Sequence, residues 1–301
     1  DACADLGEYY TGKANLVKPD YKEATRLFKI AKDNGNMKGR AFYGMMLIYG
    51  RGVAKNEKEG MKLLKEAFDV GDPSALQIYA GLLSIGVPGL VNIDPEKSAY
   101  YLESSAWKGD PSGMMYYGLC REKGRGRTKD VRDAIDYYTL AVQEGNILAA
   151  ELLGKLLYNG DPDQQLEKNS KEANKYLKLA IDNRFMGGIS IYANNLIIGD
   201  GIEQDIPEGL RLLKVGIDLN DPKSMVVYAK LLFEGKVVKK NIKEGLKLLQ
   251  KAVDLYDPDA LFEYGQLYEQ GVIIPQDLAE AVLLYEKAAK LGHKKAEERY
   301  E

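Results

Sequence analysis

Apolar residues recur along the whole chain at the three- and four-residue spacing of amphipathic helices. One clear stripe consists of Ala281, Leu284, Tyr285 and Ala288, which fall on one side of a helix. Each predicted helix has about 12–15 residues, a length that is only marginally stable alone in water. The apolar stripes therefore predict that every helix packs against its neighbours.

Two series of small residues show that these helices come in repeated pairs. The first helix of each pair carries Gly7, Gly44, Ala80, Gly118, Gly154, Ala193, Ala229 and Gly265. The second helix carries Ala24, Gly60, Ser98, Ala134, Ala173, Gly209, Gly245 and Ala281. Both series advance by 36–39 residues at each step, and such a period indicates a repeat architecture. The predicted repeats are 1–36, 37–72, 73–110, 111–146, 147–184, 185–220, 221–256 and 257–292, and residues 293–301 begin a further or capping helix.

The start of most predicted helices carries a residue suited to the free backbone amides of a first turn. Several first helices are preceded by Asp-Pro, as at Asp72 and Pro73. The aspartate accepts from the amides, and a proline at the first position gives up no bonded amide. Most second helices open with an Asp/Asn-x-x-Glu capping box, as at Asp277 and Glu280.

A few positions depart from the regular repeat. The pair Asp94 and Lys97 breaks the capping-box pattern, and the connections at 87–95 and 161–169 are longer than usual. The junction at 184–188 lacks the usual closing glycine. Because no Pro/Ser-rich linker or low-complexity tract divides the chain, we expect one continuous repeat domain over residues 1–301.

One complete repeat reads Ala-x-x-x-Leu-Gly-x-x-Tyr-x-x-Gly, then Asp-x-x-Glu/Lys-Ala and Tyr-x-x-Ala-Ala-x-x-Gly. The copy that shows it best supplies Ala260, Tyr264, Gly265, Tyr268, Gly271, Asp277, Ala281, Tyr285, Ala288 and Gly292. This pattern resembles the Sel-1-like repeat, a relative of the tetratricopeptide repeat. The resemblance covers the whole chain and implies an all-α, right-handed α-α superhelical solenoid of about eight helix-turn-helix repeats. It also implies a scaffold or adaptor that holds other proteins on a concave surface.

Charge and cysteine content narrow the expected setting and partners. The net charge is −3, so no bulk attraction to nucleic acid or to an anionic membrane is expected. No apolar run is long enough to predict a transmembrane helix. Cys3 and Cys120 lie three repeats apart and are predicted to be free thiols, and the sequence has no Asn-x-Ser/Thr sequon. These features favour a reducing, cytoplasmic setting over the endoplasmic-reticulum lumen or secretion.

The first helix of each repeat is expected to line the inner face, as in tetratricopeptide-like solenoids. At 100° per residue, the second, sixth and ninth positions after the opening Ala/Gly turn away from the packed side. This stripe includes small and polar residues at Thr11, Gln77, Gly81 and Ser84. Its candidate partner-binding residues are Met45, Ile48, Met115, Leu119, Lys155, Tyr158, Ile197, Val226, Lys230, Phe233, Phe262 and Gln266. The apolar members predict a binding strip or, alternatively, packing between adjacent repeats.

Basic residues gather in the fourth inter-helix loop, at Arg121, Lys123, Arg125, Arg127 and Lys129. Such a loop is suited to an anion or an acidic peptide. The spacing of a phosphate-binding loop is absent and no strand precedes the loop, so a solvated turn is the alternative interpretation.

The sequence predicts no catalytic residues, no metal site and no cofactor. His293 is the single histidine, and most carboxylates that stand out are helix caps. We expect a non-catalytic protein–protein interaction scaffold that binds a peptide or domain in its concave groove, with self-association through the terminal repeats as a further expectation. The alternative is the regulatory repeat region of a longer multidomain enzyme or enzyme activator, such as a kinase or synthase; an intrinsic hydrolase is the third hypothesis.

Overall fold

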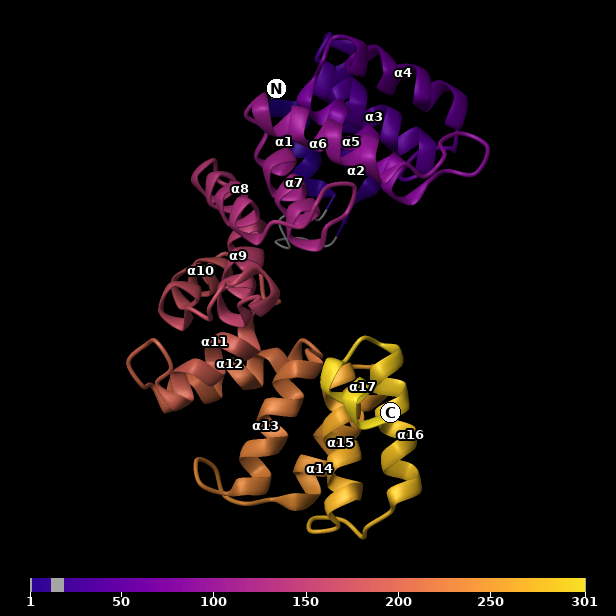
Figure 1. Ribbon diagram of the computed structural model, residues 1–301. Helices are drawn as coiled ribbons and strands as arrows, with labels where there is room; N and C mark the ends of the chain where they lie inside the picture. Colours follow the sequence, from indigo (N-terminus) through magenta and orange to yellow (C-terminus); the bar gives the residue numbers. More distant parts are fainter. Residues whose placement is uncertain (1, 12–18, 301) are drawn as a thin grey trace. The chain divides into compact units, whose positions relative to one another are not determined.

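The computed structural model describes residues 2–11 and 19–300, and it divides into two compact units, Asp1–Phe185 (unit 1) and Met186–Glu301 (unit 2) (Figure 1). The helices of unit 1 are α1 (Ala2–Tyr10), α2 (Tyr21–Asp33), α3 (Met37–Tyr49), α4 (Glu57–Asp69), α5 (Pro73–Ile85), α6 (Pro95–Trp107), α7 (Pro111–Lys123), α8 (Val131–Gln143), α9 (Ile147–Asn159) and α10 (Ser170–Asp182). Those of unit 2 are α11 (Ile189–Ile198), α12 (Ile206–Asp218), α13 (Pro222–Glu234), α14 (Ile242–Asp254), α15 (Pro258–Gln270), α16 (Leu278–Lys290) and α17 (Lys294–Tyr300).

The helices are paired as the repeats predict. The tightest packing joins the two helices of one repeat, as in α3 with α4 and α15 with α16. Within the described residues, strand-like pairing is limited to two isolated bridges, Val87 with Val91 and Asp161 with Leu166, both in the longer connections. The predicted all-α fold of repeated helix pairs is confirmed.

The helix starts follow the predicted caps. The Asp72 carboxylate accepts from the Ala75 amide at 2.9 Å. Asp94 also caps its helix, because it accepts from the Lys97 amide at 3.0 Å although the glutamate of a capping box is missing. This backbone hydrogen bond lowers the pKa of Asp94, whereas burial raises the pKa of Asp72.

The helix α11 is the exception to this capping rule. It begins after Gly188, and no side chain caps it. Arg184 takes a left-handed backbone conformation (φ 66°) near the position where most repeats have a glycine. The two units divide beside this residue, at the junction that the sequence marked as irregular.

Within each repeat the two helices come into contact where one of the facing residues is small. A Cβ on Gly44 would lie 2.7 Å from the Gly60 carbonyl oxygen, so the α3 and α4 backbones meet closely. In α7 and α15 the facing residue is a tyrosine, and the ring of Tyr138 or Tyr285 covers the helical glycine. The core is therefore a series of small-on-large contacts that recur at the repeat period.

Candidate binding site on the inner face of unit 1

A pocket of about 590 Å³ opens between α3 and α5 of unit 1. We call it the Met45 pocket, and its lining residues are Thr11, Tyr21, Phe42, Met45, Met46, Tyr49, Arg51, Gln77, Ile78, Gly81, Leu82, Ser84, Ile85, Leu102 and Tyr116. The structure thus brings together several positions of the predicted inner stripe from three successive repeats. The volume suits one or two large apolar side chains, within the range of ligand pockets.

Gly81 lines this pocket, is exposed and lies inside α5. A Cβ placed there would meet no atom within 4 Å. Among the glycines inside the described helices it is the only one of this kind, because a Cβ on each of the others would lie 3.0 Å or less from a neighbouring atom. Gly81 therefore has no packing role, and its missing side chain leaves the pocket open.

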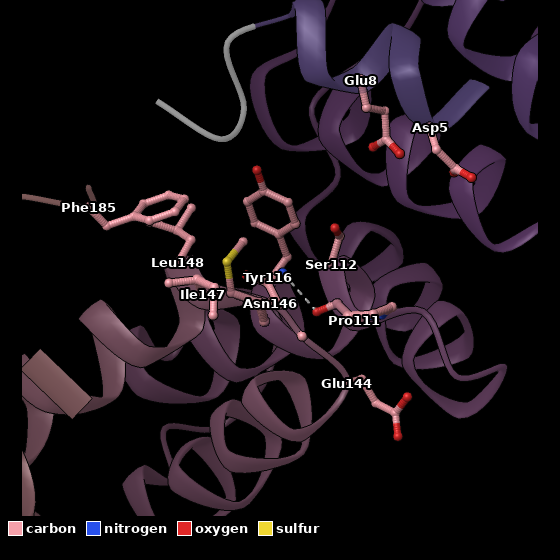
Figure 2. A pocket seen from close by; sticks show the side chains of 12 residues that line it. Asp5, Glu8, Pro111, Ser112, Tyr116, Glu144, Asn146, Ile147, Leu148 and Phe185 are labelled. Atoms are coloured by element: carbon pink, nitrogen blue, oxygen red, sulfur yellow. Dashed lines mark hydrogen bonds between the residues drawn. The ribbon is translucent and has the colours of Figure 1, made fainter. Parts of the chain in front are cut away.

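A second pocket, of about 370 Å³, lies beside the first. This Phe185 pocket is lined by Asp5, Glu8, Pro111, Ser112, Met115, Tyr116, Glu144, Gly145, Asn146, Ile147, Leu148 and Phe185 (Figure 2). Tyr116 lines both pockets, so the two are neighbours, and together we call them the groove of unit 1. The Asn146 amide donates to the Pro111 carbonyl at 3.1 Å and links the two adjacent turns beneath the pocket.

The two pockets differ in charge. Asp5 and Glu8 of α1 lie at the edge of the Phe185 pocket and both bind the Lys38 ammonium, at 2.7 and 2.5 Å. Burial lowers the pKa of Lys38, but Glu8 and Asp5 outweigh this effect and raise it. Glu144 adds a third, exposed carboxylate. The charged residue of the Met45 pocket is Arg51.

The Arg51 guanidinium is held between two aromatic rings. It lies 5.4 Å from the ring centre of Tyr21 and 5.2 Å from that of Tyr49. Such cation–π contacts keep the guanidinium at the wall of the pocket. The Met45 pocket therefore has an apolar floor and a positive edge.

Five predicted strip residues are buried: Ile48, Met115, Ile197, Val226 and Phe262. Ile48 and Ile197 each pack against the glycine of their own second helix, where a Cβ on that glycine would lie less than 3 Å from the isoleucine side chain. Phe262 stacks on His293, with ring centres 4.3 Å apart. For these five residues the burial agrees with the packing interpretation and corrects the expectation of an exposed strip, although Met115 also lines the Phe185 pocket.

Glu122 and Glu269, which occupy the ninth position of the stripe in the fourth and eighth repeats, have a structural role that the sequence did not indicate. The Tyr138 hydroxyl donates to Glu122 at 2.7 Å, and the Tyr285 hydroxyl donates to Glu269 at the same distance. Both pairs span sixteen residues and join the two helices of a repeat. In these two repeats the ninth position of the stripe therefore contacts the second helix, whereas Thr11 and Ser84 at the same position line the Met45 pocket.

The remaining candidates are half-buried or exposed but lie apart from the two pockets, except Met45. Leu119 and Lys155 line a separate pocket of about 400 Å³, where Lys155 pairs with Glu151 at 2.6 Å. The rest of this group consists of Tyr158, Lys230, Phe233 and Gln266. The Lys168 ammonium covers the Tyr158 ring at 4.2 Å, and Lys230 pairs with Glu263 at 2.6 Å.

The basic loop is largely neutralised by neighbouring carboxylates. Arg121 binds Asp133 and Asp130, and Arg127 binds Glu103 at 3.1 Å. Other pairs in this loop are Lys123 with Glu122 and Lys129 with Asp161, each at 2.5 Å. Because most of its charge is already paired, the loop fits the solvated-turn interpretation better than an anion site, and Arg125 remains exposed.

Three further expectations concern the cysteine thiols, membrane-spanning helices and metal ligands. Cys3 and Cys120 are both free, as predicted, and burial raises the pKa of Cys120. None of the helices in the described residues is long and apolar enough to cross a membrane. The described residues also contain no group of three or more His, Cys, Asp or Glu side chains placed to hold a metal ion.

Comparison with known proteins supports the repeat assignment. A family model described as Sel1 repeat matches residues 1–36, 38–72, 75–110, 111–146, 147–184, 193–221, 222–257 and 258–293. The sixth match begins later than the predicted repeat at 185. The chain resembles the mouse and rat proteins named DAP3-binding cell death enhancer 1, at 27% and 25% identity over 188 residues. Each match covers 50% of this chain and only 36% of the relative.

Two solved structures share the fold. One is a protective antigen present in uropathogenic Escherichia coli strains, with an SLR fold, a TM-score of 0.63 and 21% identity; the match covers 99% of this chain and 63% of the antigen. The other is a Sel1 repeat protein from Oxalobacter formigenes, with a TM-score of 0.70 and 18% identity, over 83% of this chain and 96% of that protein.

Proposed function

The chain belongs to the Sel1 repeat family, and we propose that it is a scaffold that binds a protein partner in the groove of unit 1. Sel1 repeat proteins generally mediate protein–protein interactions and are generally non-catalytic. The mouse relative is named for binding DAP3, which supports a protein as the partner class. The free thiols of Cys3 and Cys120 support a reducing, cytoplasmic setting for this interaction.

The observation that carries the proposal is Gly81. Glycine inside a helix costs about 0.5–1 kcal/mol relative to alanine. The other helical glycines of the described chain offset this cost by letting a neighbour approach, but Gly81 has no such neighbour. Its position at the Met45 pocket supports a role in admitting a partner side chain.

Binding follows from the lining of the pocket. An apolar partner side chain that enters it would lie against Met45, Ile78 and Leu82 and would lose water from the side that contacts them. Full burial of a leucine or phenylalanine side chain contributes about 1.5–3 kcal/mol. The half-buried methionine adapts its shape to different aliphatic or aromatic partners.

The test fills the pocket from inside. In Gly81→Trp the indole occupies the space that the partner side chain needs, and no neighbouring atom clashes with its Cβ. Random dodecapeptides displayed on phage are selected on the wild-type chain, and the affinities of selected synthetic peptides are measured by fluorescence anisotropy. We expect Gly81→Trp to weaken binding at least about tenfold, which corresponds to the loss of one buried anchor of about 1.4 kcal/mol or more.

The matched control is Lys62→Trp, which adds the same side chain at an exposed position of α4 outside both pockets. Both variants are checked for an unchanged far-UV circular dichroism spectrum. If no selected peptide distinguishes the wild type from Gly81→Trp, or if Lys62→Trp weakens binding equally, the groove is not the binding surface.

A further inference from the structure

Tyr116 connects the Met45 pocket to the Phe185 pocket, so a partner segment seated in the first can extend into the second. Figure 2 shows its ring rising from α7 between Phe185 and Ser112, with the hydroxyl directed away from the helix. No described residue forms a hydrogen bond with this hydroxyl. It is therefore available to a polar backbone group of a segment that crosses from one pocket to the other.

The edge of the Phe185 pocket is acidic. Asp5, Glu8 and Glu144 are among its lining residues and Lys38 pairs with Asp5 and Glu8, so these four side chains carry a net charge of −2; the Glu144 carboxylate is directed away from the Tyr116 ring (Figure 2). The floor beside these carboxylates is apolar and is formed partly by Ile147 and Leu148. Lysine and arginine suit such a surface because their apolar stems lie on the floor while the charged end stays at the rim.

The charge of the neighbouring Met45 pocket determines the orientation in which a basic partner segment can bind. Arg51 lines the Met45 pocket and does not line the Phe185 pocket, so a basic partner side chain is repelled at one pocket and attracted at the other. An acidic segment or a nucleic acid backbone would be repelled by the acidic residues of the Phe185 pocket.

We propose that the partner is a peptide segment with an apolar anchor for the Met45 pocket and, farther along, a lysine or arginine next to a second apolar residue for the Phe185 pocket. This inference rests on the proposed function, because it assumes that the groove of unit 1 binds a protein partner. It adds the chemistry of the segment and its orientation in the groove.

The test reverses one charge at the acidic edge. Glu144→Lys is suitable because Glu144 is exposed and makes no ion pair with a described residue, and a lysine near the C-terminus of α8 interacts favourably with the helix dipole. The control Asp136→Lys makes the same charge change at an exposed position of the same helix, outside the pocket. Dodecapeptides that bind the wild type but not Gly81→Trp are sequenced and synthesised with a fluorescent label.

We expect the selected peptides to be enriched in a lysine or arginine adjacent to an aliphatic or aromatic residue. Glu144→Lys should weaken these peptides about three- to tenfold at low salt, and the effect should shrink as sodium chloride is raised, whereas Asp136→Lys should leave the affinity unchanged. Replacing the basic residue of the peptide by alanine should remove the difference between the wild type and Glu144→Lys.

Two results separate the inference from the proposed function. If peptides lose affinity for Gly81→Trp but show no basic preference, or if both lysine variants weaken them equally, the acidic-edge inference is wrong and the proposed function stands. If no peptide distinguishes the wild type from Gly81→Trp, the proposed function fails and the inference fails with it.

Discussion

The contrast between Gly81 and Gly44 predicts opposite effects of the same substitution. Both residues lie inside helices of unit 1, and alanine adds one methyl group at each. At Gly81 the new Cβ meets no atom within 4 Å, whereas at Gly44 it lies 2.7 Å from the Gly60 carbonyl oxygen and 3.1 Å from the Leu64 nitrogen. We therefore expect Gly81→Ala to stabilise unit 1 and Gly44→Ala to destabilise it.

The magnitudes follow from helix propensity and steric contact. Alanine is favoured over glycine in a helix interior by about 0.5–1 kcal/mol, and Gly81→Ala should gain this amount in full. At Gly44 the same gain is opposed by overpacking against backbone atoms, which cannot rotate away and costs about 1–3 kcal/mol. A net loss of about 1–2 kcal/mol at Gly44 leaves the two variants about 1.5–3 kcal/mol apart.

Trp107 makes the assay specific for unit 1. It is the single tryptophan of the chain and ends α6, which packs directly against α5. The Trp107 side chain is 77% exposed, but its indole N–H donates to the Tyr137 hydroxyl at 3.3 Å, so the loss of this contact in urea, followed by fluorescence anisotropy, reports on the unit that carries both substitutions; far-UV circular dichroism follows the whole chain in parallel. For a unit of this size, 1 kcal/mol corresponds to a shift of about 2–4 °C in the melting temperature.

The sign of each change decides the outcome. A destabilised Gly81→Ala would mean that the glycine has an undetected packing role, which removes the reason for linking it to partner binding. A neutral Gly44→Ala would mean that α3 and α4 can separate without loss, contrary to the close backbone contact.

Two other predictions concern residues of the inner stripe and their partners. Phe262→Ala should destabilise unit 2 by about 3–5 kcal/mol, because the ring is 6% exposed and packs on His293 and Tyr285. Urea unfolding followed by circular dichroism would show the shift in unit 2. An unchanged urea midpoint would mean that Phe262 does not belong to the core. Burial raises the pKa of Tyr117 to about 12 and also raises the pKa of Tyr138, so both phenols stay protonated in the folded chain after they would ionise in the unfolded chain. Their contribution to stability is complete below about pH 10 and is lost as the pH rises towards 12. Tyr138→Phe should flatten this loss in urea midpoints measured between pH 9 and 12. An unaltered pH dependence would contradict the raised pKa of Tyr138.

The helix pairs were predictable from the sequence because their signals are local. An aspartate cap needs only the amides two or three residues ahead, so the cap position and the helix start are read from a few neighbouring residues. Asp94 shows the limit of the motif, because the carboxylate caps the helix without the reciprocal glutamate. A complete Asp/Asn-x-x-Glu box was enough to predict a cap, but a helix can be capped without the glutamate.

The inner stripe was only partly predictable, because a helical wheel does not show which neighbour lies on each side. The ninth position was assigned to the groove, yet Ile48 and Ile197 pack on the glycine of their second helix. A small residue in the second helix next to a large residue at this position was the signal that would have placed them in the core. The Phe185 pocket lay beyond any such pattern, since it joins α1 with α7 and α9 and depends on the curvature accumulated over several repeats.

Gly81 shows what the sequence predicts about a single position and what only the structure adds. The sequence already places it in the stripe that turns away from the packed side, next to Ala80 of the small-residue series. The distances around each glycine add that a Cβ on Gly81 would face open space at a pocket. At Gly81 the helix carries the less stable residue without a packing gain. In unit 1 that position lies at the Met45 pocket, which is why the groove, and not the paired basic loop or the buried residues Ile48 and Ile197, is the surface on which function should be sought first.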